Sequence, residues 1–182
     1  MKTEPKYIVL GILTTDCRTG YEIKKMMDRS FSHFWKLGYG QIYPTLKKIV
    51  QEGLAESHDI QQEGAPNRKE YHLTELGREE LNEWLHAPVE ELANQRNELL
   101  AKLFFARHLP TSVTIQHLQH YGERLKAQLE VYQNIKTELF ASESEKADVD
   151  YWVFTLNYGI KTLSAAIEWC TDTIEYLEKG GH

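Results

Sequence analysis

Apolar residues recur at helical spacing in the stretch between Gly38 and Glu52. Steps of three and four residues place one set on a single face of a helix that we predict from about Gly40 to Glu52: Ile42, Leu46, Ile49 and Val50. Gly53 follows where a left-handed C-terminal cap belongs, and Pro44 suits the first turn, where its missing N–H is not needed. The opposite face is polar and basic: Gln41, Pro44, Lys47, Lys48 and Gln51, with Tyr43 and Thr45 at its edges.

The hydrophobic period changes after this helix, which we call the reading helix. Residues 54–60 and 69–73 are short runs typical of strands, and the turn between them is built from Gly, Pro and Asn with Arg68 and Lys69 at its exit. A short helix with a polar outer face, followed by a hairpin with a basic tip, is typical of a winged helix-turn-helix. Such a helix fits a major groove about 12 Å wide, and the hairpin cations can neutralise phosphates. The pattern favours nucleic-acid binding.

The flanking segments complete a winged domain that we predict for residues 1–88. Residues 5–15 are apolar nearly all round, which predicts a first helix packed on several sides. Thr19 and Glu22 form a capping box for a second helix to about Phe31. Its outward cations are Lys24, Lys25 and Arg29. Thr74 is expected to cap a further helix over residues 75–86.

Residues 89–182 have a helical pattern throughout, and we predict a helical dimerisation domain there. Helices are expected over 98–108, from a Thr111 cap to about residue 140, and over 147–177. At 1.5 Å per residue the two long helices each span on the order of 40–45 Å, too much apolar surface for a small winged domain to cover. A second copy of the chain would cover it and present two reading helices to a palindromic operator. The predicted dimer contacts are Leu118, Leu125, Leu129, Tyr132, Trp152, Leu156, Ile160, Leu163 and Ile167.

The net charge of −6 does not by itself indicate a DNA-binding protein. Residues 18–69, however, hold nine Lys or Arg against six Asp or Glu, so this segment is +3 and leaves −9 for the rest. A basic patch on an acidic body follows, and local potential decides what binds. The two cysteines match no metal or redox spacing, no apolar run is long enough to span a membrane, and the N-terminus lacks a signal-peptide pattern. We therefore expect a cytoplasmic protein with reduced thiols.

These motifs resemble the signature of the PadR family of bacterial transcriptional regulators. The resemblance rests on Ile42-Tyr43-Pro44, Leu46 to Leu54, Gly64 to Lys69 and Tyr71 to Gly77. The C-terminal half is similar to the longer subfamily in length and helical pattern. The resemblance implies homodimers that bind operator DNA through the reading helix and wing, with some members released by small aromatic ligands. The predicted DNA-binding set is Tyr21, Lys24, Tyr39, Gln41, Tyr43, Pro44, Thr45, Lys47, Lys48, Asn67, Arg68 and Lys69.

Other chemistry is less well supported by the sequence. Six aromatic residues offer walls for a planar ligand, but side chains at helical spacing are more often core or dimer interface: Phe104, Phe105, Trp152, Phe154, Tyr158 and Trp169. His117 and His120 share a helical face but lack a third ligand, so no metal site is predicted. No phosphate loop, nucleophile elbow or Cys/His pairing stands out, so neither a catalytic residue nor a cofactor is predicted.

The sequence therefore predicts a mainly α-helical protein: a winged helix-turn-helix with a two-stranded wing, then an all-helical dimerisation domain with two long helices. Its predicted role is a homodimeric repressor that blocks polymerase from a palindromic operator. Three alternatives stay open: release by a small aromatic effector, activation in place of repression, and a sensing or adaptor module whose winged helix contacts protein.

Overall fold

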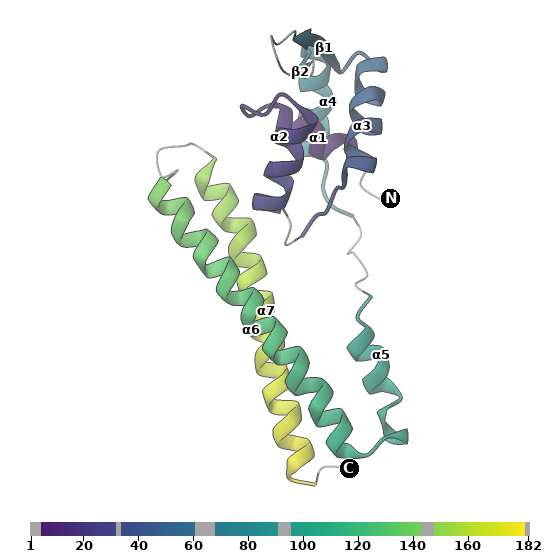
Figure 1. The fold of residues 1–182 in the computed structure, drawn as a ribbon, viewed down its shortest axis with the longest axis vertical. Helices are drawn as coiled ribbons and strands as arrows, with labels where there is room; N and C mark the ends of the chain where they lie inside the picture. Colours follow the sequence, from purple (N-terminus) through teal and green to yellow (C-terminus); the bar gives the residue numbers. More distant parts are fainter. Residues whose placement is uncertain (1–4, 32–33, 61–67, 91–95, 143–147, 181–182) are drawn as a thin grey trace. The chain divides into compact units, whose positions relative to one another are not determined.

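A computed structural model describes residues 5–31, 34–60, 68–90, 96–142 and 148–180 of the 182. The fold is mainly helical, with one two-stranded antiparallel sheet after the first three helices, which confirms the predicted fold class. The chain forms two compact units, Met1–Ala93 and Asn94–His182 (Figure 1). The domain boundary predicted after residue 88 lies just before this division and stays a prediction.

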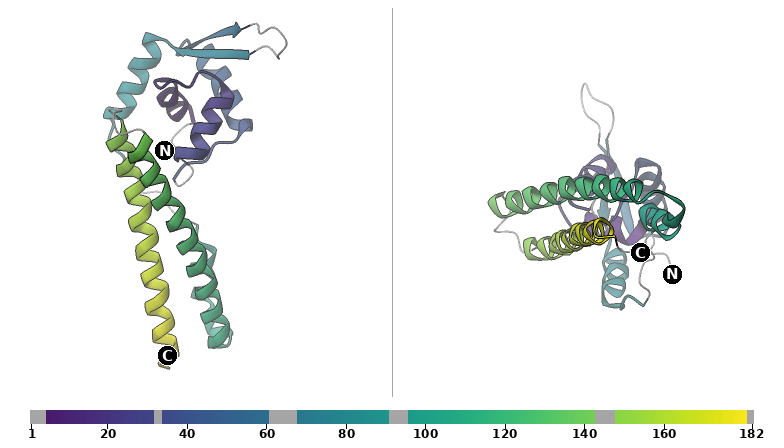
Figure 2. Two further views of the ribbon diagram at one scale, coloured as in Figure 1. Left: turned by 60° about the vertical axis from the view of Figure 1, so that its left-hand side comes forward. Right: turned by 90° about the horizontal axis from the view of Figure 1, so that it is seen from below.

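The first unit is a winged helix-turn-helix. Figures 1 and 2 show its helices gathered together with the sheet at one end. In chain order the elements are α1 (Pro5–Leu13), α2 (Gly20–Met26), the π-helix η1 (Met27–Phe31), α3 (Tyr39–Gln51), β1 (Ala55–Ile60), β2 (Arg68–Leu73) and α4 (Glu75–His86). The second helix, predicted as one element to about Phe31, therefore ends in a π-helical turn, and the first helix ends two residues before its predicted end at residue 15.

The core of this unit forms where the apolar faces of α1, α2 and α3 meet. Leu10 and Ile12 of α1 are almost completely buried because other elements surround this short helix. From α3 the side chains of Ile42, Leu46 and Ile49 are all buried, as the three- and four-residue spacing predicted. Burial of this inner face leaves the polar face of α3 outward.

The wing is joined closely to the helices on either side of it. Its antiparallel register pairs Ala55 with Leu73, and Gly53 just before it has φ 73°, the left-handed conformation predicted for the C-cap of α3. The Thr74 hydroxyl accepts a hydrogen bond from the N–H of Gly77 at 3.1 Å, which confirms that Thr74 caps α4. The same hydroxyl donates to the carbonyl of Gly53 at 2.7 Å, so one side chain ties the end of α3 to the start of α4.

The predicted places of Pro44 in the first turn of α3 and of Thr111 as a helix cap are wrong. The helix α3 begins at Tyr39, so Pro44 lies in its second turn and removes one hydrogen bond within the helix, to the carbonyl four residues earlier. The helix α6 begins at Thr111 itself, and the N–H of Val113 donates to the carbonyl of Pro110 at 2.9 Å. Thr111 is therefore the first helical residue rather than the cap.

The second unit is helical in all its described elements. These are α5 (Glu98–Phe104), the 3-10 turn η2 (Ala106–His108), α6 (Thr111–Ser142) and α7 (Val149–Glu178), of which α6 and α7 lie side by side and antiparallel (Figure 2). The helix predicted over 98–108 is thus two shorter segments. No helix in the described part of the chain is both long and apolar enough to cross a membrane.

Three of the predicted dimer residues, Leu118, Tyr132 and Leu156, are buried within a single chain. The other six are half-buried: Leu125, Leu129, Trp152, Ile160, Leu163 and Ile167. These two sets therefore contribute to the packing of one chain, and their role between copies stays a prediction. Exposed aromatic side chains lie at other positions of the same unit, including Phe154 and Tyr158 of α7.

Candidate nucleic-acid interface

The outward face of α3 carries most of the residues predicted to contact DNA. Gln41, Tyr43, Pro44, Lys47 and Lys48 are exposed, and Thr45 is half-buried at the edge. No ion pair is described for Lys47, whereas the Lys48 ammonium lies 3.7 Å from the Glu52 carboxylate one turn later. Among the described residues, Lys47 is therefore a cation on this face with no carboxylate within ion-pairing distance.

Gln41 stabilises the start of α3. Its side-chain oxygen accepts a hydrogen bond from the backbone N–H of Gly38 at 3.4 Å, while the backbone carbonyl of Gly38 accepts from the N–H of Gln41 at 2.9 Å. The Gln41 side chain thus supplies one half of a capping box, because Gly38 has no side chain to accept the other bond. The amide nitrogen of Gln41 has no described partner and is the group left to donate to a base edge.

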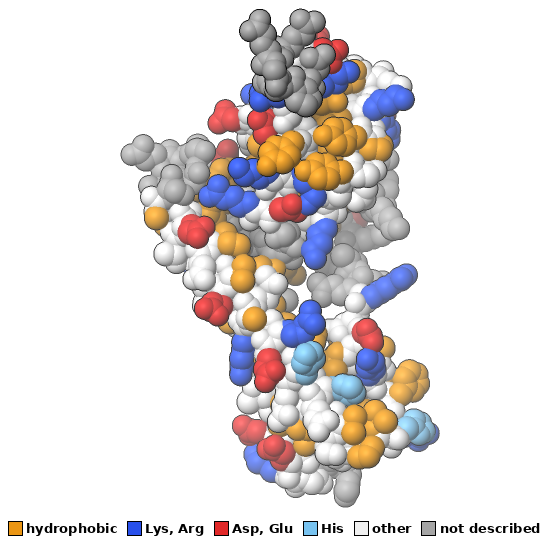
Figure 3. Space-filling view, in the orientation of Figure 1, with side chains coloured by type: hydrophobic (Ala, Val, Ile, Leu, Met, Phe, Trp, Pro, Cys, Tyr) orange, Lys and Arg blue, Asp and Glu red, His pale blue; other side chains and the backbone are white. Residues whose placement is uncertain are grey.

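Three tyrosines form an exposed aromatic surface at the junction of α2 and α3. Tyr21 is 63% exposed, Tyr39 44% and Tyr43 49%, and the rings of Tyr39 and Tyr43 stack with centroids 6.0 Å apart. Figure 3 shows hydrophobic side chains gathered over α2 and α3, with Lys and Arg side chains around them. Tyrosine suits such a surface because its ring packs against sugars or base methyl groups and its hydroxyl bonds to phosphate.

Gly20 sets the position of the Tyr43 ring. A Cβ atom at Gly20 would lie only 2.6 Å from Cε1 of Tyr43 and 2.9 Å from its Cζ, so the ring rests directly against the glycine backbone. Gly20 is the first residue of α2, and the ring belongs to α3. The contact therefore fixes an exposed side chain of the reading helix against its neighbour.

A shallow hollow beside the tyrosines gathers further cations. It is lined by Tyr21, Lys24, Lys25, Asp28, Arg29 and Tyr39. Within it Lys24 is paired with Asp28, one turn further along. Lys25 and Arg29 are exposed and have no described ion pair, yet they were not in the predicted DNA-binding set. The four-residue spacing of Tyr21, Lys25 and Arg29 is the sequence signal that places them on one stripe.

The two described cations of the wing, Arg68 and Lys69, both form ion pairs. Arg68 is paired with Glu70 on the same strand, and the Lys69 ammonium lies 3.6 Å from Asp59 on the opposite strand. The hydrogen bond that Arg68 donates to the Glu70 carboxylate, the largest contribution, raises the pKa of Arg68. Contact with phosphate would require each cation to exchange its carboxylate partner for an anionic oxygen. Asn67, also predicted to bind DNA, lies outside the described residues.

The loop before α2 holds the wing against the helices. The backbone N–H of Tyr71 in β2 donates to the carbonyl of Arg18 at 2.8 Å. The predicted capping box is present: the N–H of Glu22 donates to the Thr19 hydroxyl at 3.2 Å, and the N–H of Thr19 donates to the Glu22 carboxylate at 2.9 Å. Partial burial alone would raise the pKa of Glu22, but donors from Arg18 and Thr19 outweigh it and lower that pKa. The Glu22 carboxylate is therefore part of the N-terminal cap of α2.

The described residues give no support for a metal site. Among the residues that the structure describes, no three His, Cys, Asp or Glu side chains are placed to hold one ion. His117 and His120 line a pocket between α5 and α6, together with cationic side chains.

Two family models match the chain in succession. Residues 9–83 match the transcriptional regulator PadR-like family, and residues 95–178 match the model described as virulence activator alpha C-term. The negative transcriptional regulator PadR of Bacillus subtilis is 30% identical over 139 residues, which cover 75% of each chain. The probable transcriptional regulator Rv1176c of Mycobacterium tuberculosis is 28% identical over 189 residues, 95% of this chain and 97% of that one.

Solved structures agree with this assignment at the level of the fold. Bacillus subtilis PadR in complex with operator DNA gives a TM-score of 0.84 at 24% identity, over 94% of this chain and 98% of that chain. Its complex with p-coumaric acid gives 0.79 at 24% identity, over 95% and 94%. The motifs, the winged fold and the relative at 30% identity lead to one conclusion: this chain belongs to the PadR-like family of transcriptional regulators.

Proposed function

We propose that this regulator is a homodimeric repressor that binds a palindromic operator through the outward face of α3, the tyrosine surface and the wing. The observation that carries the proposal is the exposed, acid-free face of α3 beside the tyrosines and the cations of α2. The Bacillus subtilis relative is named a negative regulator, and its structure with operator DNA has the same fold. Repression would follow from steric exclusion of polymerase.

The proposed contacts divide by chemistry. Lys25, Arg29 and Lys47 have no described carboxylate partner, so they can neutralise phosphates without breaking an ion pair. The amide nitrogen of Gln41, at the start of α3, is the group proposed to reach a base edge. Phosphate contacts then supply most of the affinity, and the start of α3 supplies sequence preference.

Dimerisation is proposed to use the second unit. Phe154 and Tyr158 are 62% and 67% exposed and lie four residues apart on α7, with exposed Tyr151 three residues before Phe154. Apolar side chains in such a row favour burial against a partner of the same kind. A second copy of the chain is the proposed occupant, and the half-buried stripe from Leu125 to Ile167 would pack at the edges of the same interface.

A small-molecule effector would refine this role, and activation is a second candidate function. The structure of Bacillus subtilis PadR with p-coumaric acid supports a small aromatic effector here, without assigning its site. The family model of the second half is named for a virulence activator, so activation is a second candidate function. Where the operator lies relative to the promoter decides between repression and activation. Either role places the protein with the chromosome in the cytoplasm.

Binding to duplex DNA from upstream of its own gene, measured by fluorescence anisotropy at two salt concentrations, tests the proposal. We expect tight binding that weakens steeply with salt, because phosphate contacts release counterions. Lys47→Ala should weaken binding at every sequence and flatten the slope of log K against log salt by about one. The control Lys126→Ala removes an exposed cation of α6 and should leave the slope unchanged. Absence of binding at low salt, or equal slopes for both variants, would contradict the proposal.

A further inference from the structure

One face of the wing carries two histidines and two glutamates in an alternating arrangement. The antiparallel register places His58 of β1 opposite Glu70 of β2. Two positions further along, it places Glu56 opposite His72. Because side chains alternate along a strand, all four lie on the face opposite the buried ring of Tyr71, and both histidines are exposed. None of the four belongs to the DNA-binding set predicted from the sequence.

The two imidazole rings lie close together, and each also lies near a carboxylate. The centroids of the His58 and His72 rings are 5.4 Å apart. Nε2 of His58 lies 3.8 Å from the Glu56 carboxylate. Nε2 of His72 lies at the same distance, 3.8 Å, from Oε2 of Glu70. Protonation of either ring would therefore turn a contact with a neutral ring into an ion pair.

Glu70 links one of these histidines to the cation of the wing. Its Oε1 accepts a hydrogen bond from Nε of Arg68 at 3.0 Å, while its Oε2 faces His72. An imidazolium at position 72 would share the charge of this carboxylate and so weaken its hold on Arg68. The guanidinium of Arg68 would then be free to bind a phosphate oxygen, for which its planar paired donors are well suited.

The net charge of the two strands depends on the same histidines. Strands β1 and β2 hold two cations, Arg68 and Lys69, against three carboxylates, so their net charge is −1 while both imidazoles are neutral. Protonation of both rings changes it to +1. Asp59 and Lys69 form an ion pair on the opposite face, Glu22 of α2 acts on Arg68, and the guanidinium of Arg18, before α2, donates to backbone carbonyls. Histidine is the side chain type that normally changes charge between pH 5 and 8, so these groups do not offset the change.

We propose that His58 and His72 make operator binding sensitive to pH, because protonation of the two rings strengthens the contact of the wing with phosphates. This inference rests on the proposed function of DNA binding. Two imidazolium rings this close repel each other, and a polyanion beside them offsets that repulsion. Proton uptake and DNA binding therefore favour each other, and affinity rises as pH falls through the range in which histidine titrates.

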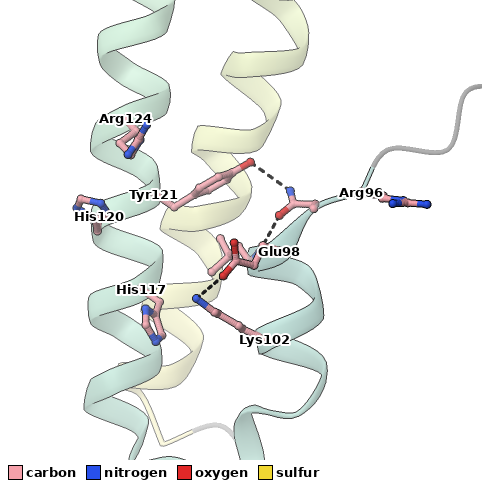
Figure 4. A pocket seen from close by; sticks show the side chains of 9 residues that line it. Arg96, Glu98, Lys102, His117, His120, Tyr121 and Arg124 are labelled. Carbon is pink, nitrogen blue, oxygen red and sulfur yellow. Dashed lines mark hydrogen bonds and ion pairs between the residues drawn. The ribbon is translucent and has the colours of Figure 1, made fainter.

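Fluorescence anisotropy with the duplex from upstream of the gene, at constant ionic strength and at about pH 5.5 and 7.5, tests this inference. We expect the full chain to bind about fivefold or more tightly at the lower pH, because one added phosphate contact gives about that factor near 0.15 M salt. The double variant His58→Gln with His72→Gln should lose most of this difference. The control His117→Gln with His120→Gln removes the same number of histidines from α6 of the second unit (Figure 4) and should retain it.

Glu70→Gln tests the link to Arg68 separately. Without the carboxylate, Arg68 is free at either pH, so binding at the higher pH should tighten and the remaining pH dependence should be smaller. Unchanged affinity of this variant at the higher pH would overturn the role of Glu70.

The same titrations separate this inference from the proposed function. Equal affinity of the unmodified chain at both pH values, or an equal pH dependence in the double variant of His58 and His72, overturns the inference and leaves operator binding in place. Absence of binding at either pH in low salt contradicts the proposed function and this inference together.

Discussion

At the scale of single residues, Gly20 and Tyr43 form the contact on which the tyrosine surface depends. The glycine begins α2, the ring lies on α3, and no side chain fits between them without moving the ring. Because Tyr43 is half exposed, the ring can swing outward and relieve an overlap. A larger residue at position 20 should thus alter DNA binding more than folding.

Gly20→Ala tests the role of this contact. We expect operator affinity to fall several-fold because the Tyr43 ring moves, while the free energy of unfolding changes by less than about 1 kcal/mol, since Ala at a helical position is itself favourable. Gly11→Ala is the matched control, because a Cβ there has no atom within 4 Å. An equal affinity for both variants in anisotropy titrations would show that the ring position does not matter.

Gln41→Ala tests base reading at the start of α3. Loss of the side chain removes the proposed base contact together with the bond from Gly38, so preference at one base position should relax. Competition binding with single-base variants of the operator measures this preference. A uniform loss across all sequences would assign Gln41 to the helix cap alone.

Residue types at fixed spacing predicted which side chains face outward, but not which of those side chains already form ion pairs. The sequence indicated both Lys24 and Lys25 as outward cations; the structure pairs Lys24 with Asp28, whereas Lys25 has no described partner. The ion pairs of Arg68 and Lys69 likewise depend on rotamers and strand register. Whether a cation is available is a property of the folded surroundings, so the sequence alone could not supply it.

At the scale of elements, α1 and α4 are joined by partly buried hydrogen bonds from Lys6 and Tyr7 to the Glu80 carboxylate. The Lys6 ammonium lies 2.6 Å from the Glu80 carboxylate, and the Tyr7 ring stacks on Trp84 at 5.0 Å. The hydrogen bond from Lys6 lowers the pKa of Glu80, and the same bond raises the pKa of Lys6. Stability from Glu80 is therefore present above the unfolded-state pKa of about 4.3 and is lost as pH falls through the lower folded-state value.

Glu80→Gln should lower the free energy of unfolding by about 0.2–1 kcal/mol at neutral pH. The difference in the free energy of unfolding between the variant and the unmodified chain should disappear at acid pH, because Glu80 is then protonated in both folded and unfolded states. On the alkaline side the Lys6 contribution is lost as pH rises through its raised folded-state pKa. Denaturant unfolding between acid and neutral pH measures this. The control Glu79→Gln, at an exposed neighbour, should have little effect at any pH, and a pH-independent cost for Glu80→Gln would refute the ion pair.

Periodicity and cap chemistry predicted the type and order of these elements well. Ile42, Leu46 and Ile49 are buried, and the caps at Thr19 and Thr74 are present, because both signals act within a few residues. The exceptions depend on contacts between residues that are far apart in the chain. Pro44 is tolerated in the second turn of α3 because the buried apolar face holds the helix around it, and that packing is not visible in the local sequence.

At the scale of the whole molecule, the apolar stripes of the long helices supported dimerisation but could not say which residues meet the second copy. Leu118 and Leu156 are buried within one chain, whereas Phe154 and Tyr158 are exposed on α7. An apolar stripe on a helix predicts that this face is buried. Only the folded structure shows whether a neighbouring helix of the same chain or a second copy of the chain buries it.

The double variant Phe154→Glu with Tyr158→Glu tests the proposed dimer surface. Two charges in an apolar interface should shift the chain from dimer to monomer in sedimentation equilibrium, because each charge would lose its hydration there. Lys161→Glu changes the charge of the same helix at an exposed polar position and should leave the dimer intact. An unaltered dimer in the double variant would place the interface on another face.

Selection of bound duplexes from a random DNA pool, with the full chain, tests most directly that two copies of the α3 surface read DNA together. We expect enrichment of an inverted repeat whose half-sites have centres separated by about 10–10.5 base pairs or a multiple of that spacing. No enrichment, or enrichment of a single asymmetric site, would contradict it.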